Sequence, residues 1–487
     1  MTTRQQNSRY SAGSHYGDLE SKESTDTAVA HNQPSVSASR EAKKDGPTDP
    51  EKGGQKRIES SDYSDPFEDD NVEGNVKYKS MKWWQGATVM IAETISLGIL
   101  SLPSVMGTIG LVPGIVLILG LGLIATYTGY VLWQFKMRYP HVVNMADVGQ
   151  ILFGRIGYEL FGAAQVILLI FSAGSHILTW TIAFNVLTGH ATCTIVWAVV
   201  ALMIFFICTL PRKLEHVSYL SIAAFISILS AVMITMVGVG IEQPDPNIQA
   251  TVSGIRFATA FVSVTNIVFA YIGHVAFFAF IAELRDPKEF PKALYVLQAV
   301  DISLYLIVSV VVYRFAGADV ASPALGSTAI KVEKVAYGIA LPTIIVAGVI
   351  YIHVAAKYIY VRVFRGTKHL TANTWLSYGV WVLITGVLWT ISFIIAESIP
   401  SFNDLLALIS SLFGSWFTYG LSGSLWLFLN EGHWFENRRK SLLTIVNFAI
   451  VVLGAVVFAC GLYASGDAIH RSTTGSSWSC ADNSKSG

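Results

Sequence analysis

The stretch that decides the fold reads Ile91-Ala-Glu-Thr-Ile-Ser-Leu-Gly-Ile-Leu-Ser-Leu-Pro103. It lies inside residues 83–109, an apolar run long enough to cross ~30 Å of hydrocarbon as a helix. Near the middle of that run the stretch places an acid, several hydroxyls, a glycine and a proline. Irregular backbone persists at membrane depth only where protein or a water-filled cavity covers it. We therefore predict a broken helix whose freed backbone groups hold a solute.

The composition indicates a polytopic α-helical membrane protein. Of the 487 residues, 52% are hydrophobic and only 14% are charged, whereas soluble domains carry roughly 25% charged residues. Hydropathy alternates regularly after the N-terminal region and predicts an all-α chain with eleven transmembrane helices. The predicted spans are residues 83–109, 112–135, 159–187, 194–211, 217–241, 256–283, 293–316, 337–364, 376–397, 402–428 and 441–465.

The two ends of the chain differ from the predicted transmembrane domain, residues 77–465. Residues 1–76 are rich in Ser, Asp, Glu, Lys and Gly, and they carry too few aliphatic side chains to offset the entropy of folding. We expect a disordered cytosolic tail. Two interpretations stay open: a regulatory segment modified by a kinase or a ubiquitin ligase, or a solvated leader without a specific role. Residues 466–487 form a short polar tail, and the polar residues 145–157 are expected at the membrane interface.

The distribution of Lys and Arg predicts the orientation in the membrane. If the N-terminus is cytosolic, 18 of the 33 basic residues flank the cytosolic ends of the spans and six lie on the opposite side. An odd number of spans then places the C-terminus outside, together with Cys193 and Cys480. A disulfide between these cysteines and two unpaired thiols are equally open interpretations. We expect an integral protein of the plasma membrane, with the vacuole as the open alternative.

The sixth predicted span has an interruption like that of the first. Its middle reads Tyr271-Ile-Gly-His274. Spans one to five cover residues 83–241 and spans six to ten cover residues 256–428, so each interrupted span opens a unit of five helices. Because five is odd, the second unit enters the membrane from the opposite face. This pattern predicts an inverted repeat with discontinuous helices one and six, which mark a substrate site at mid-membrane.

The two breaks together suit an α-amino acid. A broken helix frees N–H groups at the start of its second half and carbonyls at the end of its first half. The N–H groups of residues 96–99 would bind the carboxylate, and carbonyls near Thr94 and within residues 269–271 would bind the amino group. No Lys or Arg lies near either break, which argues against an anionic substrate. The predicted substrate-binding residues are Thr94, Ile95, Ser96, Leu97, Gly98, Ile99, Phe269, Ala270, Tyr271 and Gly273.

These motifs resemble the amino acid/auxin permease family. The resemblance rests on Gly98-Ile-Leu-Ser-Leu-Pro103, on Phe269-Ala-Tyr-Ile-Gly-His274, and on Glu283 followed by Pro287-Lys-Glu-Phe-Pro-Lys-Ala293. It covers roughly residues 80–465, and within the family the chain looks most like the fungal neutral amino-acid permeases of the methyltryptophan-resistance type. The resemblance implies eleven spans in the LeuT-like inverted-repeat fold, and secondary active transport of neutral amino acids with aliphatic and aromatic side chains.

The sequence departs from the sodium-coupled members of the resembling family. Those members resemble one another in having an Asn at the position where this chain has Ala92. The small residue that precedes Gly98 in the first-span motif is Gly in those members and Ser96 in this chain. The middle of the eighth span, Val349-Ile-Tyr-Ile-His-Val354, offers no Ser or Thr hydroxyl. A hard cation needs several oxygen ligands, whereas a proton needs only one titratable group. These features favour proton symport, with sodium coupling as the alternative.

Three residues are candidates for carrying the proton. Glu93 is an acid within a span, where such groups face a cavity or a partner; its alternative role is to order the break. His353 carries an imidazole, which titrates near neutral pH in water; its alternative is a core histidine bonded to a carbonyl. His274 lies at the second break, where it either titrates or caps freed carbonyls.

Two further acids are predicted to have structural roles. Glu283 lies near the cytosolic end of its span, and we expect an ion pair with Arg285 or with another basic residue of that end. Asp301 lies in the seventh span, and we expect it to pair with a basic residue of the same end.

Other classes of function are weighed against transport. An amino-acid sensor of the same fold is the second hypothesis, since a long N-terminal tail suits signalling as well as endocytic turnover. An enzyme is not expected, because the sequence has no metal-ligand His pair at helical spacing, no intramembrane Gly-Asp protease pair and no nucleophile elbow. We expect no metal, no cofactor and no nucleic-acid partner; the net charge of zero by itself argues neither for nor against nucleic acid.

Overall fold

The computed structural model describes residues 79–212, 214–242, 247–367, 369–370, 374–471 and 477–484, with the backbone alone for residues 214–218. The predicted N-terminal tail, with its proposed modification sites, lies outside these residues. The principal helices are α1 (Trp83–Ile109), α2 (Leu111–Arg138), α3 (Met145–Thr188), α4 (Thr194–Thr209), α5 (Leu214–Glu242), α6 (Phe257–Ala270), α7 (His274–Glu283), α8 (Phe290–Ala316), α9 (Ile330–Phe364), α10 (Trp375–Ser398), α11 (Phe402–Ile409), α12 (Leu421–Leu429) and α13 (Arg438–Arg471). The shorter elements are η1 (Pro287–Glu289), η2 (Gly317–Asp319), η3 (Ala324–Ser327) and the π-helical segment η4 (Ser410–Gly420).

Ten helical stretches of the described chain are long and apolar enough to cross a membrane. The pair α6 and α7 counts as one of them, and the run from α11 to α12 counts as another. Helix α4 has 16 residues, which corresponds to a length of about 24 Å, less than the ~30 Å of a hydrocarbon core. The predicted span 194–211 therefore forms a helix, and the total of eleven spans stays a prediction.

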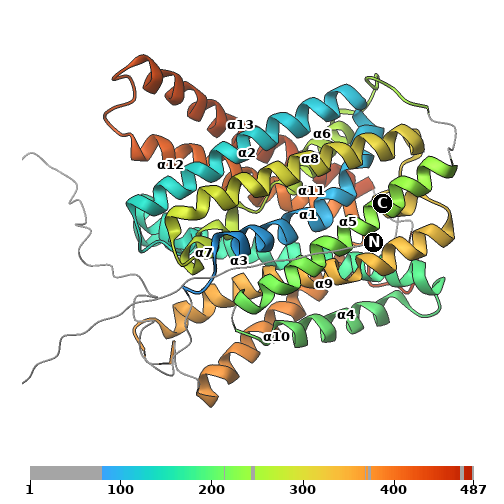
Figure 1. Ribbon diagram of the computed structural model, residues 1–487, viewed down its shortest axis with the longest axis horizontal. Helices are drawn as coiled ribbons and strands as arrows, with labels where there is room; N and C mark the ends of the chain where they lie inside the picture. The colour runs from blue at the N-terminus through green and yellow to red at the C-terminus, as the bar shows by residue number, and fades with distance from the viewer. Residues whose placement is uncertain are drawn as a thin grey trace, which may run out of the picture. The chain divides into compact units, whose positions relative to one another are not determined.

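Helix α1 lies inside the bundle, with α2 and α8 on one side and α5 and α9 on the other (Figure 1). Within its apolar stretch 94% of the residues are buried, whereas the corresponding share for α13 is 28%. The polar residues of α1 explain this position, because lipid offers no partner for an acid or a hydroxyl. Protein therefore surrounds α1, and the more exposed position is left to helices such as α13.

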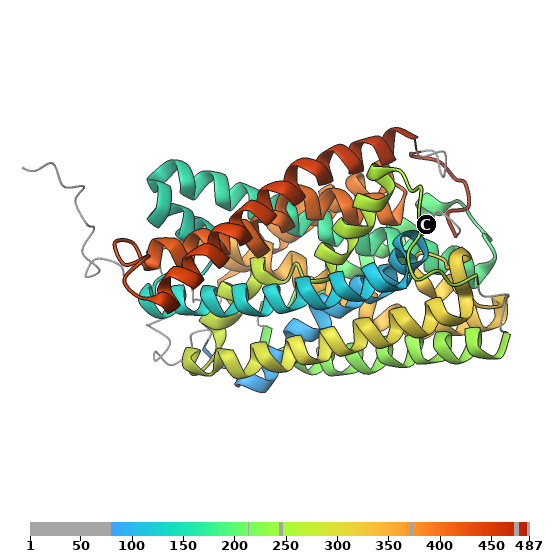
Figure 2. The same cartoon turned by 90° about the horizontal axis from the view of Figure 1, so that it is seen from above.

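Helix α13 packs obliquely along the outside of the bundle, against α6, η4 and α12 (Figure 2). The Asn447 amide nitrogen lies 2.6 Å from the Tyr127 hydroxyl oxygen, which connects α13 to α2. Helix α13 ends at Arg471, beyond residue 465, the predicted end of the transmembrane domain. The helix therefore continues past that boundary, and the boundary itself stays a prediction.

The predicted interruption of the sixth span is present as residues 271–273, between α6 and α7. We call these residues the α6–α7 junction. Tyr271 leaves the helix with φ −112° and ψ 18°, and its amide donates to the carbonyl of Val268 at 3.1 Å. Such a bond to the third preceding residue closes the last turn of a helix. The helical ladder therefore stops here and begins again at His274.

The predicted break of the first span is wrong, since α1 runs as a single helix from Trp83 to Ile109. Its polar side chains bond back to their own helix: the Thr94 hydroxyl lies 3.0 Å from the Met90 carbonyl oxygen, and the Ser101 hydroxyl lies 3.0 Å from that of Gly98. Hydroxyls satisfied in this way need no interruption of the backbone. The amides of residues 96–99 accordingly stay within the helical ladder.

The polar segment 145–157 forms the first part of α3. The Asn144 side chain caps this helix by accepting a hydrogen bond from the Asp147 amide at 3.0 Å. A bend at Gly154, with φ 63° and ψ −147°, separates the segment from the rest of α3. The interfacial position of the segment stays a prediction, and the exposed apolar side chain of Ile156 beside the bend suits it.

The C-terminal tail folds back onto the bundle. Cys480 forms a disulfide with Cys193, which directly precedes α4, so the structure selects the first of the two interpretations left open by the sequence. The Asn483 side chain is buried and lies 2.8 Å from both Asn185 and Thr181 of α3. Residues 472–476 and 485–487 lie outside the described part of the tail.

Backbone hydrogen bonds hold both ends of α1. Where α1 begins, the Met81 amide donates to the Glu283 carbonyl at 3.1 Å, and the Arg285 amide donates to the Met81 carbonyl at 2.8 Å. At its far end, the Ile109 carbonyl accepts a hydrogen bond from the Val252 amide at 3.3 Å. The helix at the centre of the bundle is therefore fastened to the end of α7 on one side and to the segment before α6 on the other.

Candidate substrate site

Helix α1 meets the end of α6 at Gly98 and Ala270. A Cβ atom on Gly98 would lie 2.9 Å from the Ala270 Cα and 3.2 Å from the Tyr305 hydroxyl oxygen. A side chain at position 98 would therefore push two helical backbones apart. Gly98, one of the predicted substrate-binding residues, permits direct contact between the two helices in this conformation.

Tyr305 of α8 joins these two segments. Its hydroxyl oxygen lies 2.9 Å from the Thr94 carbonyl oxygen on α1 and 2.9 Å from the Ala270 carbonyl oxygen at the end of α6. One O–H group therefore faces two carbonyls that were predicted to bind an amino group. The carbonyls converge on a single point, and in this conformation Tyr305 supplies the donor there.

Glu93 lies on the part of α1 that faces the α6–α7 junction. Its side chain is only 1% exposed, and within the described chain neither carboxyl oxygen has a hydrogen-bond partner. A Cβ on Gly273 would lie 2.8 Å from Thr94 Cγ2 and 3.9 Å from Glu93 Oε2, so the junction glycine leaves room for both residues. An ionised carboxylate without partners is unfavourable at this depth. Glu93 therefore needs either a proton or a partner.

Ser96 connects α1 to α3. Its hydroxyl oxygen lies 3.2 Å from His176 Nε2, and His176 Nδ1 lies 2.9 Å from the Ser172 carbonyl oxygen. A carbonyl can only accept, so Nδ1 carries the hydrogen. In the neutral imidazole Nε2 then accepts from the Ser96 hydroxyl. This pair orders the α1–α3 contact two residues before Gly98.

The two histidines proposed as proton carriers have different surroundings. His274 Nε2 lies 2.9 Å from the Ala125 carbonyl oxygen, and its Nδ1 lies 3.3 Å from that of Tyr271. This geometry matches the capping alternative. His353 is fully buried in α9, and its ring packs edge-on against Trp381 with 5.1 Å between centroids. Its position favours packing between α9 and α10.

The structure brings five of the predicted substrate-binding residues together. Thr94 and Gly98 of α1 lie against Ala270 and Gly273, and the Tyr271 ring packs edge-on against that of Tyr305 at 5.4 Å. The other five are buried in the same helices, and those of α1 present no free amides. These five are Ile95, Ser96, Leu97, Ile99 and Phe269.

Sequence reasoning missed two residues of α8. Tyr305 was not singled out, and the partner expected for Asp301 was wrong: Asp301 Oδ2 lies 2.9 Å from the Thr94 hydroxyl, which is not a basic group. Asp301 follows the start of α8 by eleven residues, or about 16 Å, so it lies too deep to reach the basic residues at the helix ends. The usable signal was the spacing of Asp301 and Tyr305, which places both on one helix face.

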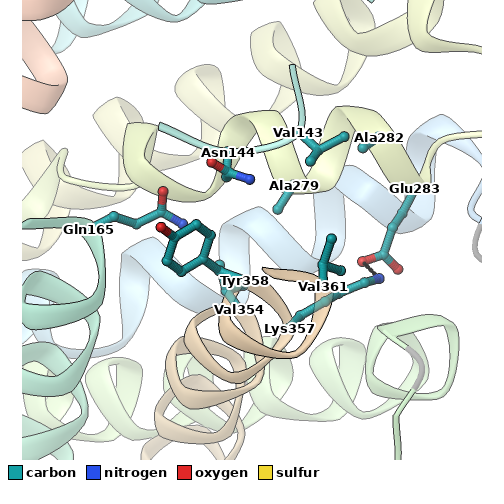
Figure 3. Close-up of a pocket in the computed structure, with 10 residues that line it drawn as sticks. All are labelled: Val143, Asn144, Gln165, Ala279, Ala282, Glu283, Val354, Lys357, Tyr358 and Val361. Carbon is teal, nitrogen blue, oxygen red and sulfur yellow. Dashed lines mark hydrogen bonds and ion pairs between the residues drawn. The ribbon is translucent and has the colours of Figure 1, made fainter. Parts of the chain in front are cut away.

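A second polar cluster lies where α7 ends. Glu283 Oε1 and Lys357 Nζ are 2.5 Å apart, and both side chains are buried. The ion pair predicted for Glu283 is confirmed. Its partner is not Arg285 but another basic residue, Lys357 of α9. Figure 3 shows this pair across a cavity from Gln165 and Tyr358. The cavity volume of about 30 Å³ is enough for about two water molecules, not for an amino acid.

The fold is shared with solved structures of membrane transporters. One is MhsT in complex with L-phenylalanine, with a TM-score of 0.54 at 11% identity over 79% of this chain and 100% of that protein. Another is Mhp1, a nucleobase-cation-symport-1 family transporter in a closed conformation with bromovinylhydantoin bound, with a TM-score of 0.52 at 15% identity over 82% of this chain and 93% of that protein. The chain is therefore a polytopic helical membrane protein of the LeuT-like transporter fold, as predicted.

Sequence comparison identifies the family. The profile of the transmembrane amino acid transporter protein family matches residues 79–466. The N amino acid transport system protein of Neurospora crassa is 35% identical over 403 residues, 81% of this chain and 86% of the relative. A transmembrane transporter of Gibberella moniliformis is 30% identical over 85% of this chain and 90% of the relative. The protein belongs to the transmembrane amino acid transporter family, whose members are transporters and not enzymes, and the resemblance noted in its motifs is confirmed.

Proposed function

We propose that the protein imports neutral amino acids, both aliphatic and aromatic, by proton symport through alternating access. The observation that carries the proposal is the meeting of α1 with the end of α6. There the carbonyls of Thr94 and Ala270 converge on one hydrogen-bond donor. The α-amino group of a substrate has the hydrogens and the positive charge that two such carbonyls favour. Family membership makes an amino acid the natural bearer of that group.

The side chains at this meeting point favour a neutral substrate. Among the described residues in contact with Thr94, Gly98 or Gly273, none is Lys or Arg, so an anionic side chain would lack a counter-charge. Tyr271 and Tyr305 supply aromatic surface beside the convergent carbonyls. Apolar substrate side chains, aliphatic or aromatic, suit such a lining.

Proton coupling is supported by the environment of Glu93. The carboxyl group is buried beside the junction and has no hydrogen-bond partner in the described chain, and a proton is the smallest ion that satisfies it. Ala92 and the hydroxyl-free middle of the eighth span weigh against a sodium site. Sodium coupling remains the alternative, since one protein of similar fold is described as a Na⁺-coupled sialic acid symporter.

Alternating access requires the contacts of this conformation to open in turn. The contact between Gly98 and Ala270 closes the middle, and backbone hydrogen bonds at Met81 and Ile109 fasten the two ends of α1. Releasing one end at a time would expose the convergent carbonyls to one side of the membrane and then to the other.

The orientation and location are part of the proposal. The bias of Lys and Arg supports a cytosolic N-terminus. The disulfide between Cys193 and Cys480 suits an oxidising compartment, which supports an outer position for the C-terminal tail. We propose the plasma membrane as the location, with the N-terminal tail available to a kinase or a ubiquitin ligase in the cytosol.

Uptake into proteoliposomes tests the function. The purified protein is reconstituted, and accumulation of radiolabelled leucine or phenylalanine is measured under an imposed pH gradient and, separately, under an imposed sodium gradient. Accumulation driven by the pH gradient alone is expected. Accumulation driven only by sodium would contradict proton coupling, and binding without flux for any amino acid would favour a sensor of the same fold.

A further inference from the structure

A second carboxyl group lies at mid-membrane beside Glu93. Asp301 of α8 is fully buried, and its Oδ2 lies 2.9 Å from the hydroxyl oxygen of Thr94 on α1. Its Oδ1 has no hydrogen-bond partner among the described residues. Buried polar atoms are satisfied almost without exception in folded proteins. The unsatisfied oxygen therefore points to a proton, a water molecule or a ligand in the working protein.

The two carboxyls belong to one local arrangement. Glu93 directly precedes Thr94, whose hydroxyl contacts Asp301. Glu93 Oε2 and Thr94 Cγ2 also both lie beside Gly273 of the α6–α7 junction. Both Glu93 oxygens and one Asp301 oxygen are buried without a partner in the described chain. Two buried acids on separate helices are thus connected through Thr94.

Among the described residues, the ionisable groups that the structure places around this pair are tyrosines. Tyr305 lies one helical turn after Asp301 and packs against the ring of Tyr271, and the Tyr351 hydroxyl oxygen of α9 lies 3.3 Å from the Glu93 carbonyl oxygen. All three are phenols, which carry no positive charge at any pH. Two adjacent carboxylates without a counter-charge repel each other strongly where the dielectric constant is low. At least one proton must therefore reside on the pair in this conformation.

We propose that Glu93 and Asp301 form a single proton-binding site between α1 and α8, and that this site carries the coupled proton. The inference rests on the proton coupling proposed above and identifies the groups that perform it. Neither acid alone is the carrier, because the charge of each sets the proton affinity of the other. Asp301 is thereby a coupling residue rather than a partner for a basic side chain.

The geometry connects this proton site to the convergent carbonyls. Tyr305 lies one helical turn after Asp301 on α8, and it contacts the Thr94 carbonyl, while Asp301 contacts the Thr94 hydroxyl. Any movement of α1 away from α8 breaks both contacts together. Separation of the helices admits water to the carboxyls and frees the carbonyls for an amino group in the same step. Release of the proton and release of the substrate would then be linked by one motion.

The test measures coupling apart from translocation. In proteoliposomes with the membrane potential clamped at zero, one pH unit drives an accumulation of about tenfold per coupled proton. For Asp301→Asn and for Glu93→Gln we expect no accumulation of phenylalanine above its external concentration. Counterflow, in which internal phenylalanine exchanges for labelled external phenylalanine without a gradient, should persist in both variants. Asp319→Asn, an exposed acid just after α8, should accumulate phenylalanine as the wild type does.

Each outcome decides between distinct statements. A wild-type protein without pH-driven accumulation would refute the proposed function itself. If the wild type and Asp301→Asn both accumulate phenylalanine to the same extent under the pH gradient, the shared proton site is overturned. The proposed function is then left intact. If folded Asp301→Asn loses both counterflow and accumulation, the shared proton site is also overturned. Asp301 would then be required for translocation as a whole.

Infrared spectroscopy covers the case in which Asp301→Asn does not fold. Difference spectra across a pH step are recorded for the wild type and for Glu93→Gln, and the carbonyl stretch of protonated carboxyls is followed. If the two acids share one site, removal of the Glu93 carboxyl shifts the midpoint pH at which the band of the remaining buried carboxyl appears. A remaining band with an unchanged midpoint would contradict the coupling of the two acids.

Discussion

At the scale of single residues, Gly98 has a packing role that its motif did not predict. The residue was singled out as part of a polar stretch that interrupts an apolar span. In the structure it stays helical, and its missing side chain brings α1 into contact with Ala270. In the predicted role and in the observed contact alike, the absence of a Cβ lets another group approach the backbone of α1 closely. The motif therefore marks a packing contact between α1 and α6, and its part in substrate binding stays a prediction.

We predict that Gly98→Val abolishes leucine uptake. A valine Cβ would lie 2.9 Å from the Ala270 Cα, so α1 and α6 would be forced apart, which typically costs about 1–3 kcal/mol. Uptake is measured in proteoliposomes, and folding is checked by size-exclusion chromatography. Gly379→Val is the matched control, because no atom lies within 4 Å of a Cβ at that position. Uptake at the wild-type rate in Gly98→Val would remove this contact from the mechanism.

At the scale of helices, continuity depends on where polar groups find partners. The hydroxyls of α1 bond to carbonyls of their own helix, which leaves its backbone ladder intact. At the α6–α7 junction the ladder itself stops, and His274 approaches the carbonyls of Tyr271 and Ala125. Both stretches look alike as sequence patterns. Only the structure shows that the backbone ladder continues through the first stretch and stops at the second.

The ion pair between α7 and α9 gives a prediction at this scale. Glu283→Gln leaves a buried ammonium group without its counter-charge, and such a change costs about 3–5 kcal/mol. Thermal unfolding of the purified protein should therefore begin at a clearly lower temperature. The double variant Glu283→Gln with Lys357→Met removes both charges and should return close to the wild-type midpoint.

An exposed ion pair supplies the control for this series. Lys292 and Glu289 are 2.8 Å apart near the start of α8, and the lysine side chain is 62% exposed. Lys292→Met should shift the unfolding midpoint little, since exposed pairs contribute about 0–1 kcal/mol. If the double variant of the buried pair is less stable than either single variant, the two groups do not act as a charge pair.

At the scale of the whole described molecule, the C-terminal tail fastens segments that are far apart in sequence. The disulfide joins Cys193 and Cys480, which are 287 residues apart, and Asn483 is buried against α3. The Trp478 amide also donates to the Glu397 carbonyl at the end of α10, at 3.2 Å. These contacts hold α3, α4 and α10 together at the end of the bundle where the tail lies.

We predict that Cys480→Ser lowers the thermal unfolding midpoint in the absence of reductant. Loss of a native disulfide typically costs about 2–5 kcal/mol. Addition of reductant should bring the wild type down to the midpoint of the variant. Cys208→Ser is the control, because Cys208 is a free and exposed cysteine. Equal midpoints for the wild type and Cys480→Ser without reductant would show that the disulfide does not stabilise the fold.

Much of the fold could be predicted because hydropathy and helix interruption are properties of consecutive residues. The positions of the apolar helices, the interruption at residues 271–273 and the family all follow from local patterns. The π-helical segment η4 could not be predicted in this way. One extra residue in a helical turn leaves no hydropathy signal, and the segment is held by close packing of Gly454 in α13 against Gly420.

The sequence by itself determined that this protein is a helical membrane transporter with polar stretches in two corresponding spans, one of which is interrupted in the structure. Only the tertiary structure decided which polar groups meet. It paired Asp301 with Thr94, brought Tyr305 between two carbonyls, and selected Lys357 as the partner of Glu283. The physical reason is that a residue's depth can be counted along its own helix, whereas its neighbours depend on how each helix is rotated. That rotation is set by packing among helices remote in sequence, and no single stretch of residues contains it.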